Sequence, residues 1–465
     1  MSSLGSTARD RTRGVSLIFP SGMLGSGFQA EPVTRGVALG AEAIAIDAGS
    51  TDSGPYYLGA GVAKSPRPAI MRDLRILLTA ARTAGVPLIV GSCGTSGTDA
   101  GVEETATLVR EIAAEERFSF RLARIYSEQS RDTIVNALSA GRVRPLPPYR
   151  ELDRATIARC AHIVGVMGHE PIVAALERGA DVVLAGRATD TSLVASVALT
   201  HGLPAGPAWH AAKTVECGDQ CTTNPHNAGV IVQIDAEGFT VSPLDPDSEC
   251  TPTSVAAHML YENVNPFRLR EPSGVLDTSQ ATYRSIDGRA VRVEGSRFEP
   301  APPTIKLEGS GIAGYETISF VGIVEPLVLA HLSTWIDGVA GMIERRGREL
   351  LGLEPGDYDI SFRCYGHNAI LGPLMPNGAA PREVGVMMRV RAPDQVTATA
   401  VARSANPVLL HLPLPGMTHM PSFAFATSPA EIERGPSYQF LLNHVLEVLD
   451  PYELFRTEFE DVNHV

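Results

Sequence analysis

The sequence has 465 residues, of which 44% are hydrophobic and 20% are charged, and its formal net charge is -13. This length allows two or three domains around a large buried core. The negative charge argues against non-specific binding to nucleic acid or to an anionic membrane, so we expect neither as a partner.

The six cysteines are scattered along the chain and do not form the close spacings of a disulfide framework. We therefore expect reduced thiols in a cytoplasmic protein. The first residues, MSSLGSTARDRTRG, lack the apolar segment of a signal peptide, and no run of about eighteen apolar residues occurs. We expect neither a signal peptide nor a membrane-spanning helix.

The first part of the chain alternates apolar, strand-like segments with helical patterns. The strand-like segments lie at residues 15–19, 41–50, 86–97, 118–130, 161–168 and 180–190, and the helical patterns at 33–40, 67–85, 102–116 and 170–179. This alternation predicts an α/β fold with a largely parallel sheet flanked by helices. The strand-like segments end in small and polar residues. Because ligands of such sheets bind at the carboxyl ends of the strands, we expect the functional site there.

The alternation stops at about residue 205. Residues of about 210–320 hold short β-like runs and polar loops, and a helical pattern returns at 325–353. Further on, the sequence predicts strands at 360–366, 383–392 and 454–462 and helices at 394–412 and 435–449. We assign residues 1–355 to an α/β domain with a β-rich portion at about 210–320, and residues 356–465 to an α+β domain.

A glycine-rich loop follows the first predicted strand. Gly22, Gly25 and Gly27 form a G-x-x-G-x-G pattern. This differs from the G-x-G-x-x-G of dinucleotide-binding folds, although Asp47 lies about twenty residues further on. The favoured interpretation is a loop that faces a substrate or binds an anion. A structural tight turn and a dinucleotide site are the alternatives.

The exit of the third strand, GSCGTSG, holds Ser92, Cys93, Gly94 and Ser96. A nucleophilic Cys93 on a strand-to-helix turn is one interpretation, but the hydrolase pattern G-x-S-x-G is missing. A nest of backbone N–H groups that binds a carboxylate or phosphate is favoured.

The exit AGRATD places Arg187, Thr189 and Asp190 at the same edge. Arg187, with Thr189 beside it, is a candidate for binding a substrate carboxylate. Asp190 either caps the following helix or takes part in catalysis. His169, in the neighbouring exit MGHE, is a candidate for proton transfer, with a structural role as the alternative.

The segment VECGDQCTTNPHN (215–227) crowds together Glu216, Cys217, Asp219, Cys221 and His226. A C-x-x-x-C pattern with one histidine lacks the paired C-x-x-C units of a structural zinc site. The two acidic residues are instead candidates for an acid/base pair or for holding a hydrated divalent ion. A polar connecting loop is nearly as good an interpretation.

Lys306 and Glu308 occupy alternate positions of a further predicted strand and therefore lie on one face of it. They form an ion pair or face the cleft.

Six segments occur in an order that runs from about residue 15 to 320: SGMLGSGFQAEP, VPLIVGSCGTSG, ADVVLAGRATDTSLV, HAAKTVECGDQ, TPTSVAAHMLYENVNPFRL and IKLEGSGIAGYE. Together they resemble the acyclic terpene utilisation AtuA family, and residues 360–465 resemble the ferredoxin-like domain that accompanies it. The resemblance implies a role beside genes for the degradation of acyclic terpenoids and for carboxylic-acid and acyl-CoA catabolism. It also raises the expected importance of residues 186–190 and 216–218.

We therefore expect a catabolic enzyme, a hydratase/lyase or an isomerase, that acts on a small or branched carboxylic acid or its acyl-CoA thioester. In this hypothesis Arg187 and the strand-end loops hold the carboxylate. Glu216, Asp219 or His169 transfers a proton next to the carbonyl group.

Two alternatives stay open. One is a hydrolase that uses Cys93, Cys217 or a metal-bound water, and the other is a non-catalytic ligand-binding or scaffold subunit. No cofactor is identified, and binding of a divalent metal is left open. We expect a homo-oligomer with a small-molecule substrate.

Overall fold

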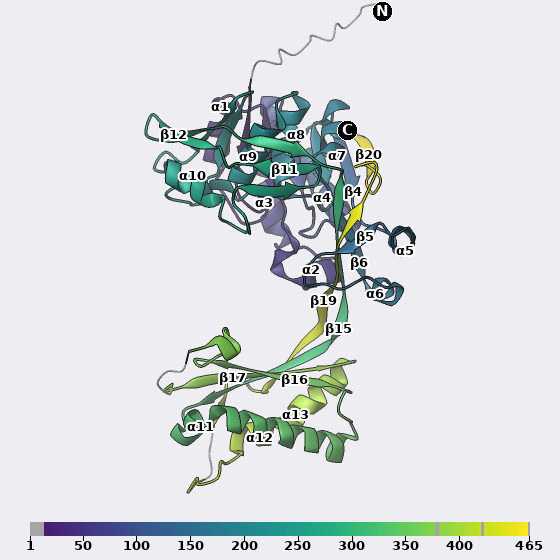
Figure 1. The fold of residues 1–465 in the computed structure, drawn as a ribbon, viewed down its shortest axis with the longest axis vertical. Coiled ribbons are helices and arrows are strands. Elements are labelled where there is room, and N and C mark those ends of the chain that lie inside the picture. Colours follow the sequence, from purple (N-terminus) through teal and green to yellow (C-terminus); the bar gives the residue numbers. More distant parts are fainter. Residues whose placement is uncertain (1–13, 377–380, 420–422, 464–465) are drawn as a thin grey trace, which may run out of the picture. The chain divides into compact units, whose positions relative to one another are not determined.

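The computed structural model of the protein describes residues 14–376, 381–419 and 423–463. The chain forms two compact units (Figure 1). The first contains the residues up to 311 together with those from 440 onward, and the second contains residues 312–439. No helix in the described ranges is long and apolar enough to cross a membrane.

A ten-stranded sheet forms the centre of the first unit. Its strand order is β12 (Thr282–Ile286), β13 (Ala290–Glu294), β9 (Gly238–Pro243), β8 (Val230–Ile234), β1 (Val15–Phe19), β2 (Ala43–Asp47), β3 (Leu88–Gly91), β7 (Val182–Ala185), β4 (Phe120–Tyr126) and β20 (Arg456–Val462). The strands from β1 to β4 in this order are parallel, and those on either side are antiparallel. The predicted mixed α/β fold with parallel strands flanked by helices is confirmed.

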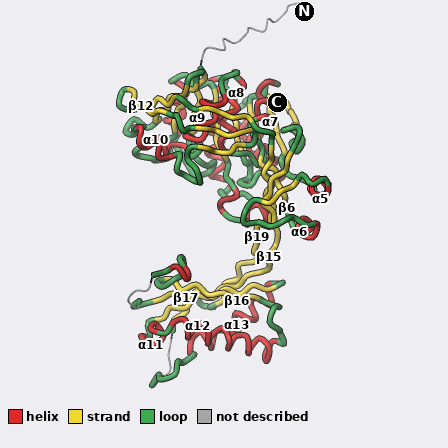
Figure 2. The backbone as a smooth tube through the Cα atoms, viewed as in Figure 1, coloured by secondary structure: helices red, strands yellow, loops and turns green. Residues whose placement is uncertain are grey.

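The sheet has a hydrophobic core on each face. Alternate residues of a strand point to opposite faces, so Leu17 and Phe19 join one core while Ile18 joins the other. The first core also contains residues of α7 (Glu170–Glu177), α8 (Asp190–Thr200) and α9 (Ala205–Val215). The second contains residues of α1 (Ala30–Ala38), α3 (Arg67–Ala84) and α4 (Asp99–Glu116). In Figure 2 the strands of this unit accordingly lie among helices.

Shorter elements complete the first unit. The helices are η1 (Thr51–Ser53), α2 (Pro55–Ala60), α5 (Arg131–Ser139), α6 (Arg154–Arg159), η2 (Gly218–Cys221) and α10 (Pro252–His258). The strands β10 (Arg268–Glu271), β11 (Gly274–Asp277) and β14 (Arg297–Pro300) form an antiparallel sheet, and β5 (Val143–Pro145) pairs with the last residues of β19 (Glu431–Glu447).

The segment predicted as a strand at 161–168 forms β6 (His162–Val166), but β6 does not join the parallel sheet. It pairs antiparallel with residues 306–310 of β15 (Thr304–Ile323). The expectation that all six strand-like segments share one sheet is therefore wrong for β6. The apolar sequence of β6 is compatible with pairing in the parallel sheet or with β15, so the sequence does not predict which strand it pairs with. The bridge between Met167 and Ala188 still brings its end next to the exit of β7.

In the second unit, β17 (Val384–Ala392) pairs antiparallel with both β15 and β16 (Asp359–Tyr365). Trp335, Met388 and Val401 belong to its hydrophobic core. The other elements of this unit are α11 (Pro326–Ala330), α12 (Leu332–Arg346), η3 (Gly347–Leu351), η4 (Gly372–Leu374), α13 (Gln395–His411) and β18 (Ala424–Phe425).

The helix predicted at residues 435–449 is wrong, because most of this segment belongs to β19. Leu442, His444 and Leu446 are buried, whereas the residues between them are less buried. This period of two is typical of a strand, and the helix prediction followed the overall apolar content instead.

The compact units divide the chain at points other than the predicted boundary after residue 355. The helix α12 packs against α13 of the second unit, and β20 pairs with β4 of the first. The helical pattern at 325–353 therefore goes with the α+β unit, and the last strand goes with the α/β unit.

Candidate functional site

The predicted loops meet at the carboxyl ends of the parallel strands. The N–H of Leu24, after β1, donates to the carbonyl of Asp47 at the end of β2 (2.7 Å). Gly97, after β3, approaches the exit of β7 so closely that a Cβ atom there would lie 2.0 Å from the backbone nitrogen of Arg187. The exits of four strands thus form one edge of the first unit, where a ligand is expected to bind.

Arg187 is the centre of a buried polar network at this edge. Its Nε donates to Glu308 Oε2 (3.1 Å) and its Nη1 to Ser92 Oγ (3.1 Å). The predicted ion pair of Lys306 with Glu308 is present, with 2.7 Å between Nζ and Oε1. Burial alone would raise the pKa of Glu308, but the charges of Arg187 and Lys306 outweigh it and hold that pKa at about 2. The negative charge of Glu308 therefore balances the buried positive charge of Arg187.

Two aspartates lie within range of the Arg187 charge. Asp47 is buried, and its Oδ2 accepts from the N–H of Gly49 (2.9 Å), while Oδ1 has no hydrogen-bond partner among the described residues. Burial raises the pKa of Asp47, and the charge of Asp190 raises it further. Burial also raises the pKa of Asp190, against the opposing charge of Arg187. Since 33% of the Asp190 side chain is exposed, a substrate can reach this carboxyl group.

Asp190 is the first residue of α8, and its carboxyl group lies 3.7 Å from Arg187 Nη1. The N-cap residue is Thr189, whose side chain makes no capping bond and instead accepts from Thr191 Oγ1 (3.3 Å). The capping role considered for Asp190 is therefore wrong. Its position in the first helical turn still favours the ionised form.

A second group of buried charges lies at the end of α9. Lys213 and Glu216 form a buried ion pair through Glu216 Oε1. Burial raises the pKa of Glu216 to about 7, and the charge of Asp190 adds to this effect. Glu271, the last residue of β10, accepts a hydrogen bond from Thr191 Oγ1 (3.1 Å), and burial raises its pKa to about 8. Lys213 lies in the segment HAAKTVECGDQ, but nothing in the sequence indicates a role for it, and Glu271 lies outside the segments that were singled out.

These side chains form what we call the carboxyl-edge cluster: Asp47, Arg187, Asp190, Lys213, Glu216, Glu271 and Glu308. Five carboxyl groups face two cations within it, and Lys306 adds a third cation from its border. Glu216 and Glu271, whose pKa values are raised to about 7 and about 8, exchange protons near neutral pH, which suits general acid/base chemistry.

An open groove of about 740 Å³ lies next to the cluster. It is lined by Ser21, Gly22, Met23, Ser26, Cys217, Gln220, Thr222, Asn227, Ser254, Ala257, His258 and Tyr261. The groove thus combines the predicted glycine-rich loop, the predicted segment 215–227 and the end of α10. Burial raises the pKa of Cys217, and the charges of Glu216 and Asp190 raise it further, so the cluster lies close to this residue of the groove lining.

Three side chains can act together as metal ligands, and two of them, Cys217 and His258, line the groove. One donor atom each from Glu216, Cys217 and His258 lies within 4.8 Å of the others. Burial lowers the pKa of His258 to about 4, so its imidazole is neutral, and burial raises the pKa of the Cys217 thiol to about 12. His258 lies in the segment TPTSVAAHMLYENVNPFRL, but nothing in its spacing singled it out as a ligand.

Asp219 does not join the cluster. Its Oδ2 accepts from the N–H groups of His226 (2.8 Å) and Ala228 (3.0 Å), so it holds the conformation of its own loop. Cys221 is buried and interacts with Cys250. Of the crowded segment 215–227, Glu216 and Cys217 therefore reach the site, and the predicted pairing of Glu216 with Asp219 has no support.

The glycine-rich loop is tied to the protein by its own backbone. The N–H groups of Gly25 and Gly27 donate to Asp73 Oδ2 (2.9 and 3.1 Å). These donors are therefore engaged by a protein carboxylate and do not form the expected anion site. Gly22 lines the groove, and Gly218 lies so close to the loop that a Cβ atom there would be 2.9 Å from Ser21 Cα.

The loop after β3 is packed tightly. Cys93 is buried, and burial raises its pKa to about 12, which does not suit a nucleophile. Gly94 packs against Gly101, and Ser96 donates to the carbonyl of Tyr57 (3.5 Å). Of the four predicted residues, Ser92 is therefore the one that contacts the carboxyl-edge cluster.

His169 lies apart from the groove lining. Its Nδ1 is 3.4 Å from Glu170 Oε2, and its ring packs edge-on against Trp209 (5.5 Å between centroids). Burial lowers the pKa of His169. These contacts fit the structural alternative for this residue.

The model of one protein family, the acyclic terpene utilisation family protein AtuA, matches residues 62–434. The chain belongs to the AtuA family. No curated protein and no solved structure matches it. Membership suggests a role in acyclic terpene utilisation. The match to AtuA includes Arg187, Asp190, Glu216 and His258, and it begins after Asp47 and the glycine-rich loop.

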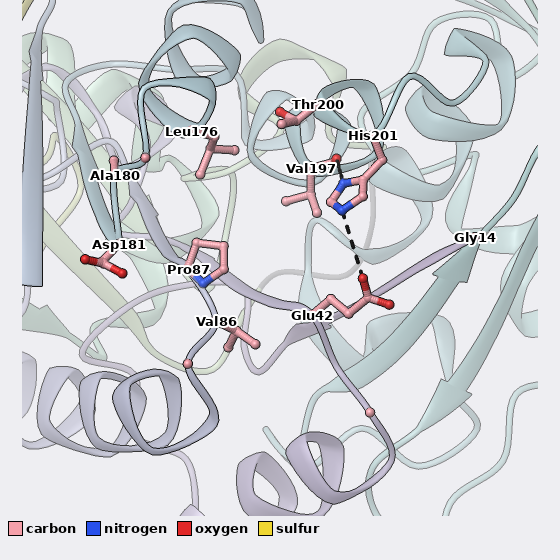
Figure 3. A pocket seen from close by; sticks show the side chains of 13 residues that line it. Gly14, Glu42, Val86, Pro87, Leu176, Ala180, Asp181, Val197, Thr200 and His201 are labelled. Carbon is pink, nitrogen blue, oxygen red and sulfur yellow. Dashed lines mark hydrogen bonds and ion pairs between the residues drawn. The ribbon is translucent and has the colours of Figure 1, made fainter. Parts of the chain in front are cut away.

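This AtuA-family chain has a second cavity, of about 640 Å³, at the opposite edge of the sheet (Figure 3). It is lined by residues that precede the parallel strands, such as Glu42, Pro87 and Asp181, together with His201 from the end of α8. His201 Nε2 lies 3.9 Å from Glu42 Oε2, and His201 Nδ1 lies 2.9 Å from the carbonyl of Val197. This cavity is remote from the carboxyl-edge cluster, which contains the candidate chemistry.

Proposed function

We propose that the protein is a catabolic enzyme that acts on a small or branched carboxylic acid or its acyl-CoA thioester by acid/base catalysis. The observation that carries this proposal is Asp190, a one-third exposed carboxyl group with a raised pKa, whose charge acts on Cys217 of the groove lining. A carboxyl group that substrate can reach and whose pKa is raised by burial is suited to general acid/base work.

The proposed reaction is the addition or removal of water, or the shift of a double bond, next to a carbonyl group. In the ionised form Asp190 takes a proton from carbon or water, and in the protonated form it returns a proton to the other centre. Arg187 orients Asp190 from 3.7 Å and is itself held by Glu308 and Ser92. This makes Arg187 a positioning residue, because its Nε and Nη1 already have partners.

The groove supplies the place for the substrate. Ser21, Gln220 and Tyr261 offer polar groups along its wall, and Met23 and Ala257 offer apolar surface. Binding sites for small organic molecules combine apolar walls with a few placed polar groups in this way. A hydrolase based on Cys93 has no supporting observation, because that thiol is buried and its pKa is raised to about 12.

The proposal is tested with the full-length protein and a panel of branched carboxylic acids and acyl-CoA thioesters. Compounds that raise the melting temperature are incubated with the protein in D2O, and uptake of deuterium next to the carbonyl group is followed by mass spectrometry. Asp190→Asn should lower the rate by about 10²–10⁴-fold. The matched control is Asp52→Asn, which alters an exposed carboxylate whose charge also reaches Asp190.

Equal exchange rates in the wild type and in Asp190→Asn would remove Asp190 from the mechanism. Binding of a ligand with neither exchange nor turnover in the wild type would favour the alternative of a non-catalytic binding or scaffold subunit.

The proposal also includes a homo-oligomer in the cytoplasm, whose second unit has a ferredoxin-like fold. Light scattering of the purified protein tests the oligomeric state, since a monomeric mass would contradict it.

A further inference from the structure

We infer that Glu216, Cys217 and His258 form a binding site for a divalent transition-metal ion, with Zn²⁺ as the best-matched ion and an open coordination position toward the groove. The donors are a carboxylate, a thiolate and an imidazole. These are the three ligand types that bind Zn²⁺ in proteins, and hard cations such as Mg²⁺ prefer oxygen ligands alone.

The spacing of the three donors suits one ion. Their ligand atoms lie within 4.8 Å of one another. In a tetrahedral zinc site, neighbouring ligand atoms are separated by about 3.3–3.8 Å, as follows from bond lengths of about 2.0–2.3 Å. The donors therefore need to approach one another by about an ångström, which side-chain rotation can supply.

His258 provides an independent observation. The residue is 7% exposed, and its Nε2 is buried without a hydrogen-bond partner among the described residues. A buried polar atom that lacks a partner carries a free-energy cost. A bound ion would give the imidazole a partner, and Nε2 is one of the two nitrogens that bind metals in proteins.

Glu216 can accept an ion without losing its present partner. Lys213 binds its Oε1, and Oε2 makes no hydrogen bond within the described part of the chain. The carboxyl-edge cluster contains more carboxyl groups than cations, so a divalent ion would also offset its excess negative charge. An anionic substrate in the same groove would benefit from this positive charge.

Three protein ligands and an open position are typical of catalytic zinc sites, whereas structural sites are closed by four ligands. Cys217 and His258 both line the groove, so the fourth position faces the space for the substrate. That an ion there would polarise a substrate carbonyl rests on the proposed function, whereas binding of the ion does not.

Cobalt is a suitable probe, because thiolate ligation of Co²⁺ produces a ligand-to-metal charge-transfer band. The full-length protein is stripped with a chelator, titrated with Co²⁺ and then with Zn²⁺, and its metal content is measured by mass spectrometry. We expect one ion per chain, a thiolate band that Zn²⁺ abolishes, and a higher melting temperature with the ion.

Single substitutions assign the ligands. Cys217→Ser should abolish the thiolate band. His258→Gln should weaken Co²⁺ binding by at least ~100-fold, since loss of even an outer-shell partner costs about 10–100-fold. The matched controls are Cys364→Ser, in the second unit, and His201→Gln, at the amino edge of the sheet, which should leave the band and the affinity unchanged.

A wild-type protein that binds no stoichiometric Co²⁺ or Zn²⁺ would overturn the inference, and so would a thiolate band that survives Cys217→Ser. The readouts do not depend on turnover. Metal binding without any proton exchange at the substrate would therefore support this site and contradict the proposed function. Proton exchange without metal binding would support the proposed function and contradict this site.

Discussion

The two edges of the central sheet carry cavities of similar size but different chemistry. The groove at the carboxyl edge measures about 740 Å³ and the cavity at the amino edge about 640 Å³. At the amino edge, Glu42 lies near His201, and Asp181 pairs with Arg82 (2.8 Å). At the carboxyl edge, Asp47 and His258 each keep a buried atom without a partner among the described residues. Arg82 Nε at the amino edge is likewise buried without a partner among the described residues, so the feature that distinguishes the candidate site is its group of buried carboxyl groups with raised pKa values.

The difference has a structural cause. Helices begin at the carboxyl edge, where their N-termini favour carboxylates such as Asp190. They end at the amino edge, where the chain turns back through glycines with positive φ, namely Gly40, Gly85, Gly179 and Gly202. The amino edge is therefore formed by turns, and the carboxyl edge by functional groups.

The largest expected effect comes from breaking the buried network. Arg187→Met would leave Glu308 without its main partner and should lower the free energy of unfolding by about 3–5 kcal/mol. At the amino edge, Arg82→Met should cost about 1 kcal/mol or less, because its partner Asp181 is 41% exposed. Urea unfolding of both variants measures the difference. Equal losses in the free energy of unfolding of the two variants would contradict the expected difference between the two edges.

A pair of glycines at the two ends of β3 should give the next largest difference. Gly97 and Gly85 have nearly the same φ (+68° and +67°), but a Cβ atom at 97 would meet backbone at 2.0 Å, whereas one at 85 would meet nothing within 4 Å. Gly97→Ala should therefore cost about 2–4 kcal/mol, and Gly85→Ala about 1 kcal/mol. Thermal unfolding compares them, and a Gly85→Ala variant that is the less stable would refute the prediction.

The raised pKa of Glu271 should affect how the free energy of unfolding depends on pH. Burial and the charges of Glu216 and Asp190 raise its pKa to about 8, against the opposing charge of Lys213, from an ordinary value of 4.5. Between about pH 4.5 and 8 the folded protein keeps a proton that the unfolded chain releases, so stability falls as the pH rises.

Glu271→Gln should remove this component, which amounts to at most about 1.4 kcal/mol per pH unit. Urea unfolding at several pH values measures it. Parallel curves for the wild type and the variant would show that Glu271 titrates normally in the folded protein.

The smallest effect is expected at the amino edge itself. His201→Gln should change the free energy of unfolding by less than about 0.5 kcal/mol and leave proton exchange at the substrate unaltered. Calorimetry and the deuterium assay measure these quantities. A substantial loss of exchange would move the functional site toward the amino edge.

The sequence was sufficient for much of the sheet but not for the strand partners. The apolar segments at 15–19 and 180–190 form β1 and β7. Continuous apolar runs between helices are typical of parallel strands that are buried on both faces. The partner of β6 and the strand β19 were missed. Pairing over long distances leaves no local signal, and the period of two at Leu442, His444 and Leu446 was masked by a generally apolar segment.

The candidate site was predicted in part for a similar reason. Arg187, Asp190 and Glu216 were found because they lie at strand exits or in a crowded polar segment. Glu271 was missed because it is a single polar residue outside the segments that were singled out. His258 lies in one of those segments, but no partner stands near it in the sequence, and only folding brings it beside Glu216 and Cys217. Asp219 was overvalued, since closeness in sequence to Glu216 does not determine where a side chain points.

The close approach of Gly218 to Ser21 has an evolutionary consequence. Any side chain at 218 would push the glycine-rich loop away from Cys217, so the groove could not keep both of its walls. We expect descent within the family to tolerate change at Gly218 only together with compensating change near Ser21. Substitutions at Gly218 and near Ser21 would therefore appear together, whereas the glycines of the amino-edge turns would vary independently of one another.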